Sequence, residues 1–287
     1  MKLIDTHSHW GTQRGYVLRT EAELAQQKKT WNSEAKYSTE EEMANYFRAS
    51  QAQVILDLGF TKFAPLDEIK PLHDYSFATQ RLYPDAIIGN WFHIDPVFHG
   101  KDAGLKELRR CIDAQAGFTG LAVNGSGSVP ASDPLYDPYY RLCIEAAIPV
   151  LIFVGTTGLG AGLPGGNGIL LDSCHPRHLD MVAARNPLLR IVAARPGWPW
   201  QTETIAVLMH KRNIWYELHG WSPKYFAPDL KHDIARRLQD RIMFGGDYPL
   251  YTYERLTSEW RAEGYSETIL NKVFYQNAEA FLAGVDR

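Results

Sequence analysis

The stretch Leu3-Ile4-Asp5-Thr6-His7-Ser8-His9 begins with two apolar residues and runs directly into a polar string. Seven further short apolar runs follow, at residues 54–56, 86–93, 118–123, 149–154, 189–194, 214–218 and 241–244. Short runs rich in Val and Ile, separated by helix-length segments, are typical of buried parallel strands with crossover helices. Eight such units predict an α/β protein with a (β/α)₈ TIM barrel. A doubly wound open sheet is the alternative.

The segments between the runs support this prediction. Residues 102–114 carry Leu105, Leu108 and Ile112 on one face with basic residues opposite, which indicates an amphipathic helix. A second helix is predicted over 138–147, with Asp137 as N-cap and Pro138 as its first residue. Residues 40–48, 180–184 and 203–211 are also predicted to be helical.

Two segments do not fit the simple alternation of short strand and helix. Residues 11–50 form a long polar stretch after the first strand, and residues 155–168 are rich in glycine. Both follow predicted strands, so both are expected at the face of the barrel where enzymes build their sites and lids. We therefore predict one domain over residues 1–287, with 11–50 as a lid insertion. A flexible surface connector is the alternative for 155–168.

Composition narrows the class of protein. The 287 residues include 30 Lys and Arg against 33 Asp and Glu, a formal charge of -3, which gives no sign of a nucleic-acid or anionic-membrane partner. Three widely spaced cysteines do not suit a disulfide scaffold. No apolar run has the length of a signal peptide or a membrane helix. We expect a cytoplasmic enzyme that acts on a small molecule.

His7 and His9 are the first candidate functional residues. On an extended chain, positions i and i+2 face the same way, so the two imidazoles are predicted to project together from the end of the first strand. Two converging imidazoles suit Zn²⁺ or another divalent transition metal. The plainer alternative is a pair of solvated loop histidines.

Asp247 is the second candidate, within Phe244-Gly245-Gly246-Asp247-Tyr248-Pro249 after the last strand. The first and last strands are neighbours in a closed barrel, so Asp247 is expected beside the histidine pair. A carboxylate there can bind a metal and accept a proton from water bound to it. The alternative is an aspartate that serves only the turn.

These two motifs together resemble the amidohydrolase-related family, in the branch of aminocarboxymuconate-semialdehyde decarboxylase and the resorcylate and dihydroxybenzoate decarboxylases. The stretches 155–158, 195–201 and 220–226 are also similar to this family, so the likeness covers nearly the whole chain in order. The resemblance implies a metal-dependent barrel that hydrolyses or decarboxylates small carbonyl or aromatic acids. It also implies a homodimer or tetramer.

The sequence departs from the family at two positions. The resemblance implies a metal-binding His at the end of the fifth strand, where this chain has Phe153, and a His at the end of the sixth, where it has Arg195. Phe cannot bind a metal, and Arg has no lone pair to offer. The ordinary set of ligands therefore cannot form. Only His7, His9 and Asp247 carry over from the family.

Replacement ligands are available on the seventh strand. Glu217 and His219 share one face of that strand, and either could complete a displaced metal site. The alternative is a buried ion pair between Glu217 and Arg195, with His219 as a hydrogen-bonded residue at the rim. Arg195 itself could clamp a carboxylate or stabilise an oxyanion, or it could be paired only for structure.

Six further residues are predicted to line a substrate pocket. Tryptophans in a barrel also serve packing, and His175 and His178 after Cys174 are interpreted as the start of a helix rather than as metal ligands. The predicted pocket residues are Asp57, His93, Asn124, Phe153, Trp198 and Trp200.

Three functions remain open from the sequence. Phe153, Arg195 and Glu217-Leu218-His219 are similar to a subgroup of 4-hydroxyphenyl-β-ketoacyl-CoA hydrolases, which implies hydrolytic C–C cleavage with Asp247 as base, Arg195 as oxyanion donor and His219 as a further catalytic group. The first alternative is a decarboxylase that takes its proton from His219 or Asp247. The second is a catalytically silent ligand-binding barrel. The expected cofactor is Zn, with Mn or Fe as alternatives. The sequence contains no phosphate-binding motif that would indicate coenzyme A.

Overall fold

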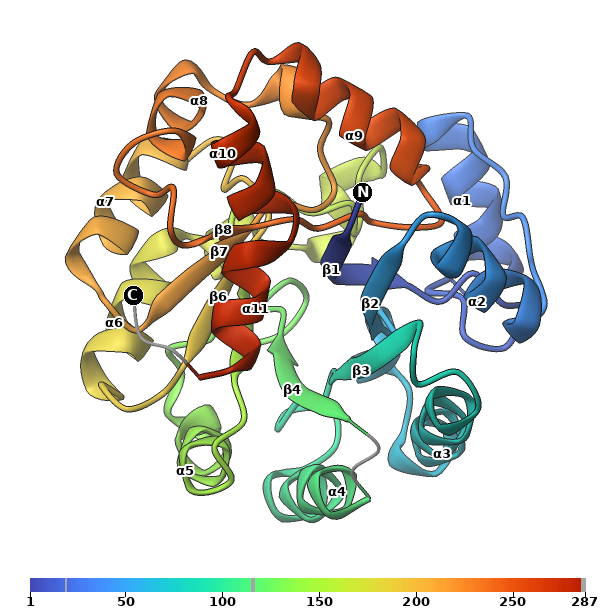
Figure 1. Ribbon diagram of the computed structural model, residues 1–287. Helices are drawn as coiled ribbons and strands as arrows, with labels where there is room; N and C mark the ends of the chain where they lie inside the picture. The colour runs from blue at the N-terminus through green and yellow to red at the C-terminus, as the bar shows by residue number, and fades with distance from the viewer. Residues whose placement is uncertain (19, 115–116, 285–287) are drawn as a thin grey trace.

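The computed structural model describes residues 1–18, 20–114 and 117–284. Eight parallel strands follow one another around a barrel in the order β1-β2-β3-β4-β5-β6-β7-β8, and helices surround them (Figure 1). The (β/α)₈ prediction is confirmed and the open-sheet alternative is wrong. The strands are β1 Leu3–His9, β2 Ala52–Asp57, β3 Ile87–Phe92, β4 Phe118–Val123, β5 Val150–Phe153, β6 Ile191–Ala194, β7 Ile214–Glu217 and β8 Ile242–Met243.

The barrel closes between β1 and the segment that follows β8. The backbone N–H of Thr6 donates to the carbonyl of Phe244 at 2.9 Å, and the N–H of Asp247 donates to the carbonyl of His7 at 3.1 Å. The N–H of His9 donates to the carbonyl of Tyr248 at 2.7 Å. These bonds continue the parallel ladder beyond the short β8. They fix the first and last motifs of the chain side by side, as the sequence predicted.

Side chains fill the barrel in layers, as is usual for this fold. One buried cluster combines inward-facing residues from all eight strands, among them Ile4, Ile55, Trp91, Leu151 and Met243. A second, larger cluster lies between the outer face of the strands and the helices. We call the end of the barrel at the carboxyl ends of the strands its mouth. The interior below the mouth is packed with apolar side chains, so polar groups facing the interior gather at the strand ends.

The helices alternate with the strands as predicted. The start of α5 differs by one position, because Tyr136 is the N-cap and Asp137 is already helical. His175 caps α6 by accepting from the N–H of Arg177, so the 174–178 segment is a helix start. The α-helices are α1 Glu21–Trp31, α2 Glu40–Ala49, α3 Leu66–Leu82, α4 Lys101–Asp113, α5 Asp137–Glu145, α6 Pro176–Arg185, α7 Gln201–His210, α8 Pro228–Ile234, α9 Tyr253–Ala262, α10 Glu267–Asn271 and α11 Asn277–Leu282.

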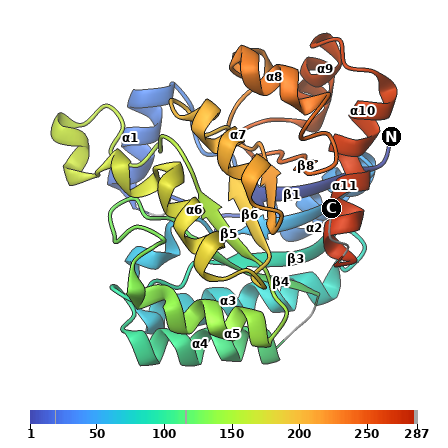
Figure 2. The same ribbon diagram turned by 90° about the vertical axis from the view of Figure 1, so that its left-hand side faces the viewer.

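The two long segments meet at one end of the barrel. Figure 2 shows α1 and the segment after β5 together at the end opposite the chain termini. The Gln26 side chain donates to the carbonyl of Ala161 at 2.8 Å, which joins α1 to the glycine-rich segment. Within 11–50, α2 buries Met43, Ala44 and Phe47 against the barrel as a crossover helix would. A lid role is therefore proposed for α1 and the 155–168 segment, and α2 belongs to the wall.

Among the described helices, none has the length and apolar character needed to span a bilayer.

Candidate active site

A β-bulge in β1 turns both histidines into the barrel. In the ladder with β2, Asp5 pairs with Val54 but Ser8 pairs with Leu56, so β1 carries one extra residue between the two pairs. Simple alternation from the inward-facing Ile4 would have directed His7 outward. The bulge changes the alternation, and His7 and His9 then face the interior together. The sequence predicted their shared face but not the bulge that selects it.

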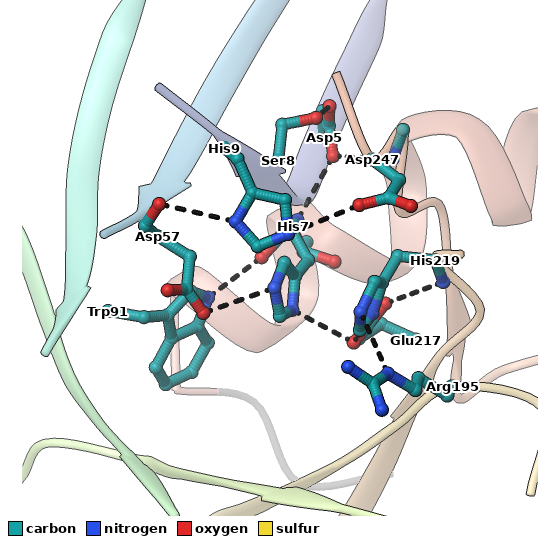
Figure 3. Close-up of polar contacts among 12 residues, drawn as sticks. Asp5, His7, Ser8, His9, Asp57, Trp91, Arg195, Glu217, His219 and Asp247 are labelled. Atoms are coloured by element: carbon teal, nitrogen blue, oxygen red, sulfur yellow. Dashed lines mark hydrogen bonds and ion pairs between the residues drawn. The ribbon is translucent and has the colours of Figure 1, made fainter. Parts of the chain in front are cut away.

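Glu217 lies behind two of the histidines and orients them (Figure 3). Its Oε1 atom is 3.1 Å from His7 Nδ1 and 2.6 Å from His219 Nδ1, and its Oε2 accepts from the backbone N–H of His219 at 2.8 Å. A carboxylate only accepts, so both Nδ1 atoms carry the proton. The two rings stack at 3.7 Å between centroids. Glu217 therefore fixes both tautomers and leaves both Nε2 atoms unprotonated, each with a lone pair.

His7 and His9 each direct Nε2 at a carboxylate. His7 Nε2 lies 3.2 Å from Asp57 Oδ2, and His9 Nε2 lies 3.2 Å from Asp247 Oδ1. His9 Nδ1 is 3.3 Å from the backbone carbonyl of Asp57, so its Nδ1 also carries the proton. In the neutral tautomers, each Nε2 lone pair thus faces a carboxylate oxygen. Such a contact becomes favourable only with a proton or a cation between the two atoms.

The electrostatics of this group favour added positive charge. Burial alone would raise the pKa of Asp57, Glu217 and Asp247, but the neighbouring imidazoles outweigh it and lower all three. For His7, burial acts downward, yet Glu217 and Asp57 raise its pKa to about 10. Burial lowers the pKa of His219 to about 4, so this ring is neutral at pH 7.

A divalent metal ion fits these residues. Three ionised carboxylates against the single guanidinium of Arg195 leave a charge of −2 when the histidines are neutral. The Nε2 atom of His7 is buried, and in the neutral tautomer it faces Asp57 Oδ2 at 3.2 Å with no hydrogen between the two atoms. Ligand atoms on a tetrahedral ion with bonds of about 2.0–2.1 Å lie roughly 3.3 Å apart, close to the spacings found here.

The ligand set that the structure favours differs from the predicted one. His7, His9 and Asp57 bring one donor atom each within 4.8 Å of one another, and Asp247 adjoins this group through His9. Asp57 was predicted to bind substrate rather than metal. Glu217 forms a second possible metal-binding group with His7 and His219, and it contacts their Nδ1 atoms, the position of a carboxylate that orients ligating histidines. Its predicted role as a metal ligand stays a prediction.

Arg195 lies beside His219 at the mouth of the barrel and has an unusual backbone conformation (Figure 3). Its φ of 75° belongs to the left-handed region, which a residue with a side chain rarely adopts. Its Nε donates to His219 Nε2 at 3.4 Å and its Nη1 to the carbonyl of Thr156 at 3.1 Å. Neither bond involves a carboxylate, so the structure does not contain the ion pair with Glu217 considered from the sequence. The guanidinium charge remains available to an anion.

Phe153 forms the surface on which these groups rest. The Arg195 guanidinium lies 4.7 Å from the centre of its ring. The rings of His7, His93 and His219 lie 5.6, 5.7 and 5.8 Å from the same ring. Where the family resemblance implied a metal ligand, this chain has an apolar ring that packs beside three imidazoles and against the guanidinium of Arg195.

The remaining predicted pocket residues divide into two pairs. His93 and Asn124 are buried at the ends of β3 and β4, and His93 contacts Asp57. Trp198 is 48% exposed, and its described ring contact is with Trp221, whereas Trp200 lies against His175. Among the described residues, these ring contacts do not bring either tryptophan to the histidine cluster. Their role as a pocket wall stays a prediction.

Asp5 and Tyr253 support the site, but neither was a candidate functional residue from the sequence. Asp5 accepts from the N–H of His7 at 3.0 Å, the N–H of Gly246 at 2.8 Å and the hydroxyl of Tyr253 at 2.7 Å. It thus ties the histidine motif to the aspartate motif. A Cβ at Gly246 would lie 2.4 Å from Asp5 Oδ2, and one at Gly245 would lie 2.5 Å from Glu217 Oε2. The Gly245-Gly246 pair is the feature of the sequence that could have indicated these contacts, because only a residue without a side chain lets the backbone approach the two carboxylates so closely.

Histidines and carboxylates are gathered at the carboxyl ends of the strands of a closed parallel barrel. Barrel enzymes build their active sites at these ends. The chain belongs to the amidohydrolase family, whose sequence pattern matches residues 4–283. The resemblance drawn from the two motifs is thereby confirmed at the level of the family. No sequence among curated proteins matches this chain.

Solved structures similar to this chain share its fold at low sequence identity. An uncharacterised TIM-barrel protein from Bordetella bronchiseptica is 20% identical with a TM-score of 0.74, over 99% of both chains. A 2,6-dihydroxybenzoate decarboxylase from Rhizobium is 15% identical with a TM-score of 0.72, over 99% of both chains. A dihydroxybenzoic acid decarboxylase from Polaromonas sp. JS666, solved with manganese and 2-nitroresorcinol, is 13% identical with a TM-score of 0.70, over 98% of this chain and 97% of the other.

Proposed function

We propose that this protein is a metal-dependent carboxy-lyase that removes carbon dioxide from a small aromatic acid. The observation that carries the proposal is the presence at one mouth of a donor set suited to a divalent cation and of a guanidinium whose two hydrogen bonds go to His219 and Thr156 rather than to a carboxylate. The decarboxylases among its structural neighbours support this choice over hydrolytic C–C cleavage.

His7, His9, Asp57 and Asp247 would hold the ion. A bound divalent ion would act as a Lewis acid toward the carboxylate and an adjacent oxygen of the substrate. The mixed imidazole and carboxylate donors suit Zn²⁺, Mn²⁺ and Fe²⁺. Manganese in the Polaromonas neighbour supports Mn²⁺ among these, while Zn²⁺ was the first expectation from the sequence.

The chain's own residues would bind the acid and move one proton. Arg195 offers Nη2 to an anionic oxygen of the substrate, while Phe153 supports its guanidinium from below. Loss of carbon dioxide requires a proton at the carbon that carried the carboxylate. His219 is neutral with Nε2 as an acceptor, so it has no proton to give there. Each release of carbon dioxide consumes one proton from the solvent, and Asp247, ionised at neutral pH, would accept that proton and pass it to the carbon as the bond to the carboxylate breaks.

Hydrolysis of an aromatic β-keto thioester is the second candidate. Arg195 favours it as well, because a guanidinium beside the site could stabilise the oxyanion of a tetrahedral intermediate. In that case Asp247 would act as the general base toward water. The two reactions differ in their products, since one releases carbon dioxide and the other yields two organic fragments.

The proposal is tested by incubating protein loaded with Mn²⁺ or Zn²⁺ with a panel of benzoates that carry one or two hydroxyl groups. Release of carbon dioxide from at least one acid, abolished by removal of the metal with a chelator and restored by its return, is the expected result. Cleavage of a β-keto thioester without carbon dioxide would favour the hydrolase. A protein that binds ligands but turns over neither class would be the silent barrel considered from the sequence.

A further inference from the structure

Within the described part of the chain, Arg195 forms hydrogen bonds with two groups, and one of them is an imidazole nitrogen (Figure 3). Its Nε donates to Nε2 of His219 at 3.4 Å, and its Nη1 donates to the carbonyl of Thr156 at 3.1 Å. A guanidinium can only donate, so Nε2 of His219 has to be the unprotonated nitrogen of its ring. The imidazole of His219 is therefore an acceptor placed against the guanidinium.

The other side of the His219 ring requires the same protonation state. Oε1 of Glu217 lies 2.6 Å from His219 Nδ1, and Oε2 accepts from the backbone N–H of His219 at 2.8 Å. An ionised carboxylate only accepts, so Nδ1 carries the proton and Nε2 carries the lone pair. Glu217 and His219 are both buried. Glu217, His219 and Arg195 thus form a chain of hydrogen bonds in which each bond fixes the sense of the next.

These contacts hold the guanidinium while leaving part of it open. The ring of Phe153 covers one of its faces, with 4.7 Å between the guanidinium carbon and the ring centre. The remaining N–H groups, on Nη1 and Nη2, have no hydrogen-bond partner among the described residues. A flexible side chain that is held in advance loses less conformational freedom when a ligand binds. An arginine held in this way is prepared for an anionic oxygen.

We propose that His219 is a positioning residue: oriented by Glu217, it holds the guanidinium of Arg195 in place for the anionic group of the substrate. This role differs from the metal ligand and the catalytic group that the sequence suggested for His219. The inference rests on the proposed function in that Arg195 binds the substrate, but it is the same for carbon dioxide release and for hydrolysis. Because Oε1 of Glu217 also lies 3.1 Å from His7 Nδ1, one carboxylate oxygen would orient both His219 and a metal-binding histidine.

The first measurement follows the Nε–H group of Arg195 by NMR in full-length protein with isotope-labelled arginine. Loss of the signal in Arg195→Lys identifies it. The hydrogen should exchange with water at least about tenfold more slowly in the wild type than in His219→Leu, where its acceptor is missing. His219→Gln, whose amide oxygen can accept, should restore part of this protection. His73→Leu, at a buried histidine of α3, should leave the exchange rate unchanged.

The second measurement is a double-mutant cycle on the affinity for benzoate, determined by calorimetry with metal-loaded protein. His219→Leu should weaken binding at least about tenfold when Arg195 is present and less than about twofold in the Arg195→Ala background, because residues that act as a unit are not additive. The metal content should equal that of the wild type in every variant.

The outcomes separate this positioning role from the proposed function. Equal exchange of the Arg195 hydrogen in the wild type and His219→Leu would overturn the role, as would additive effects in the cycle. Loss of metal from His219→Leu would overturn it too, since His219 would then be a ligand. Carbon dioxide release is measured separately on the same samples. Slow exchange and a non-additive cycle without any release would keep the positioning role and remove the decarboxylase.

Discussion

Among the described residues, one buried group of histidines and carboxylates lies at the mouth of the barrel and another lies between its outer helices, and they differ in how well they suit a metal. At the mouth, His7 and His9 face Asp57 and Asp247 with no guanidinium between them. Outside the barrel, His73 of α3 lies 2.7 Å from Glu107 of α4, and Cys111 lies 3.4 Å from the same imidazole nitrogen. Both groups place three donor atoms within 4.8 Å of one another.

The difference is in how their charge is balanced. Arg110 binds both oxygens of Glu107, at 2.9 and 2.7 Å, and neutralises it. Burial lowers the pKa of His73 and raises that of the Cys111 thiol, so the charge of the outer group is balanced without an added ion, although Nε2 of His73 has no hydrogen-bond partner among the described residues. At the mouth, Arg195 turns to His219 and Thr156 and leaves the carboxylates short of positive charge. Donor types alone therefore do not identify a metal site, and the nearest permanent cation must be counted as well.

The largest effect is expected from removing the donors at the mouth. His7→Ala/His9→Ala should lose about one equivalent of Mn or Zn and at least about 10³-fold in carbon dioxide release, because no Lewis acid then remains. Elemental analysis of protein purified without chelator measures the metal. His73→Ala should keep its full metal content. Equal metal in both variants would place the ion elsewhere.

Arg195→Ala tests whether the two sides of the mouth act separately. Turnover should fall by about 10²–10³-fold, since a preorganised cation for the substrate's charge is lost. Metal content should stay at the wild-type level, because Arg195 contacts none of the proposed ligands. Steady-state kinetics and elemental analysis on the same sample measure both. A parallel loss of metal would show that the guanidinium supports the donors instead.

Glu217→Gln tests the assignment of Glu217 as an orienting group rather than a ligand. The metal dissociation constant should rise by about 10–100-fold, as found when partners of ligating histidines are altered. Competition with a chromophoric chelator measures the constant. Glu107→Gln, the matching change in the outer group, should leave it unaltered. Complete loss of metal in Glu217→Gln would show that Glu217 binds the metal directly.

Glu107 should make the stability of the protein depend on acid pH. Burial acts upward on its pKa, but His73 and Arg110 lower it to about 2 from the ordinary value of 4.5. A lowered folded-state pKa stabilises the protein fully above 4.5, and this contribution disappears as the pH falls through 2. Between pH 7 and pH 3 the loss is about 2 kcal/mol. Urea unfolding at the two pH values should show a smaller loss for Glu107→Gln, and an equal loss would contradict the pairing.

The smallest effect is expected at the contact that joins β1 to the segment after β8. Tyr253→Phe removes the hydroxyl that donates to Asp5 at 2.7 Å and should lower the free energy of unfolding by about 1 kcal/mol. Urea unfolding measures this change. Tyr275→Phe, whose hydroxyl is not bound to Asp5, is the control. No difference between the two variants would mean that Asp5 is satisfied by its backbone donors alone.

Much of the fold and part of the site follow from local sequence. The eight apolar runs predicted every strand, because parallel strands buried on both faces need continuous Val, Ile and Leu. His7, His9 and Asp247 were predicted to meet, since a closed barrel makes its first and last strands neighbours. The partners Asp57 and Asp5 were not identified as such. Their roles depend on a bulge in β1 and on contacts across more than two hundred residues.

The sequence by itself determined the barrel, the family and the strand ends at which the candidate functional residues lie. The apolar runs and the polar motifs that follow them can be recognised along the chain without knowledge of any long-range contact. Only the tertiary structure decided which of these groups meet. It set Glu217 against the Nδ1 atoms of His7 and His219, and it directed Arg195 to His219 and Thr156. Within the described part of the chain, it also left Nδ1 of His93 and Nδ2 of Asn124 without hydrogen-bond partners. Such contacts depend on distances of a few ångströms between distant residues, and these distances arise only when the barrel closes.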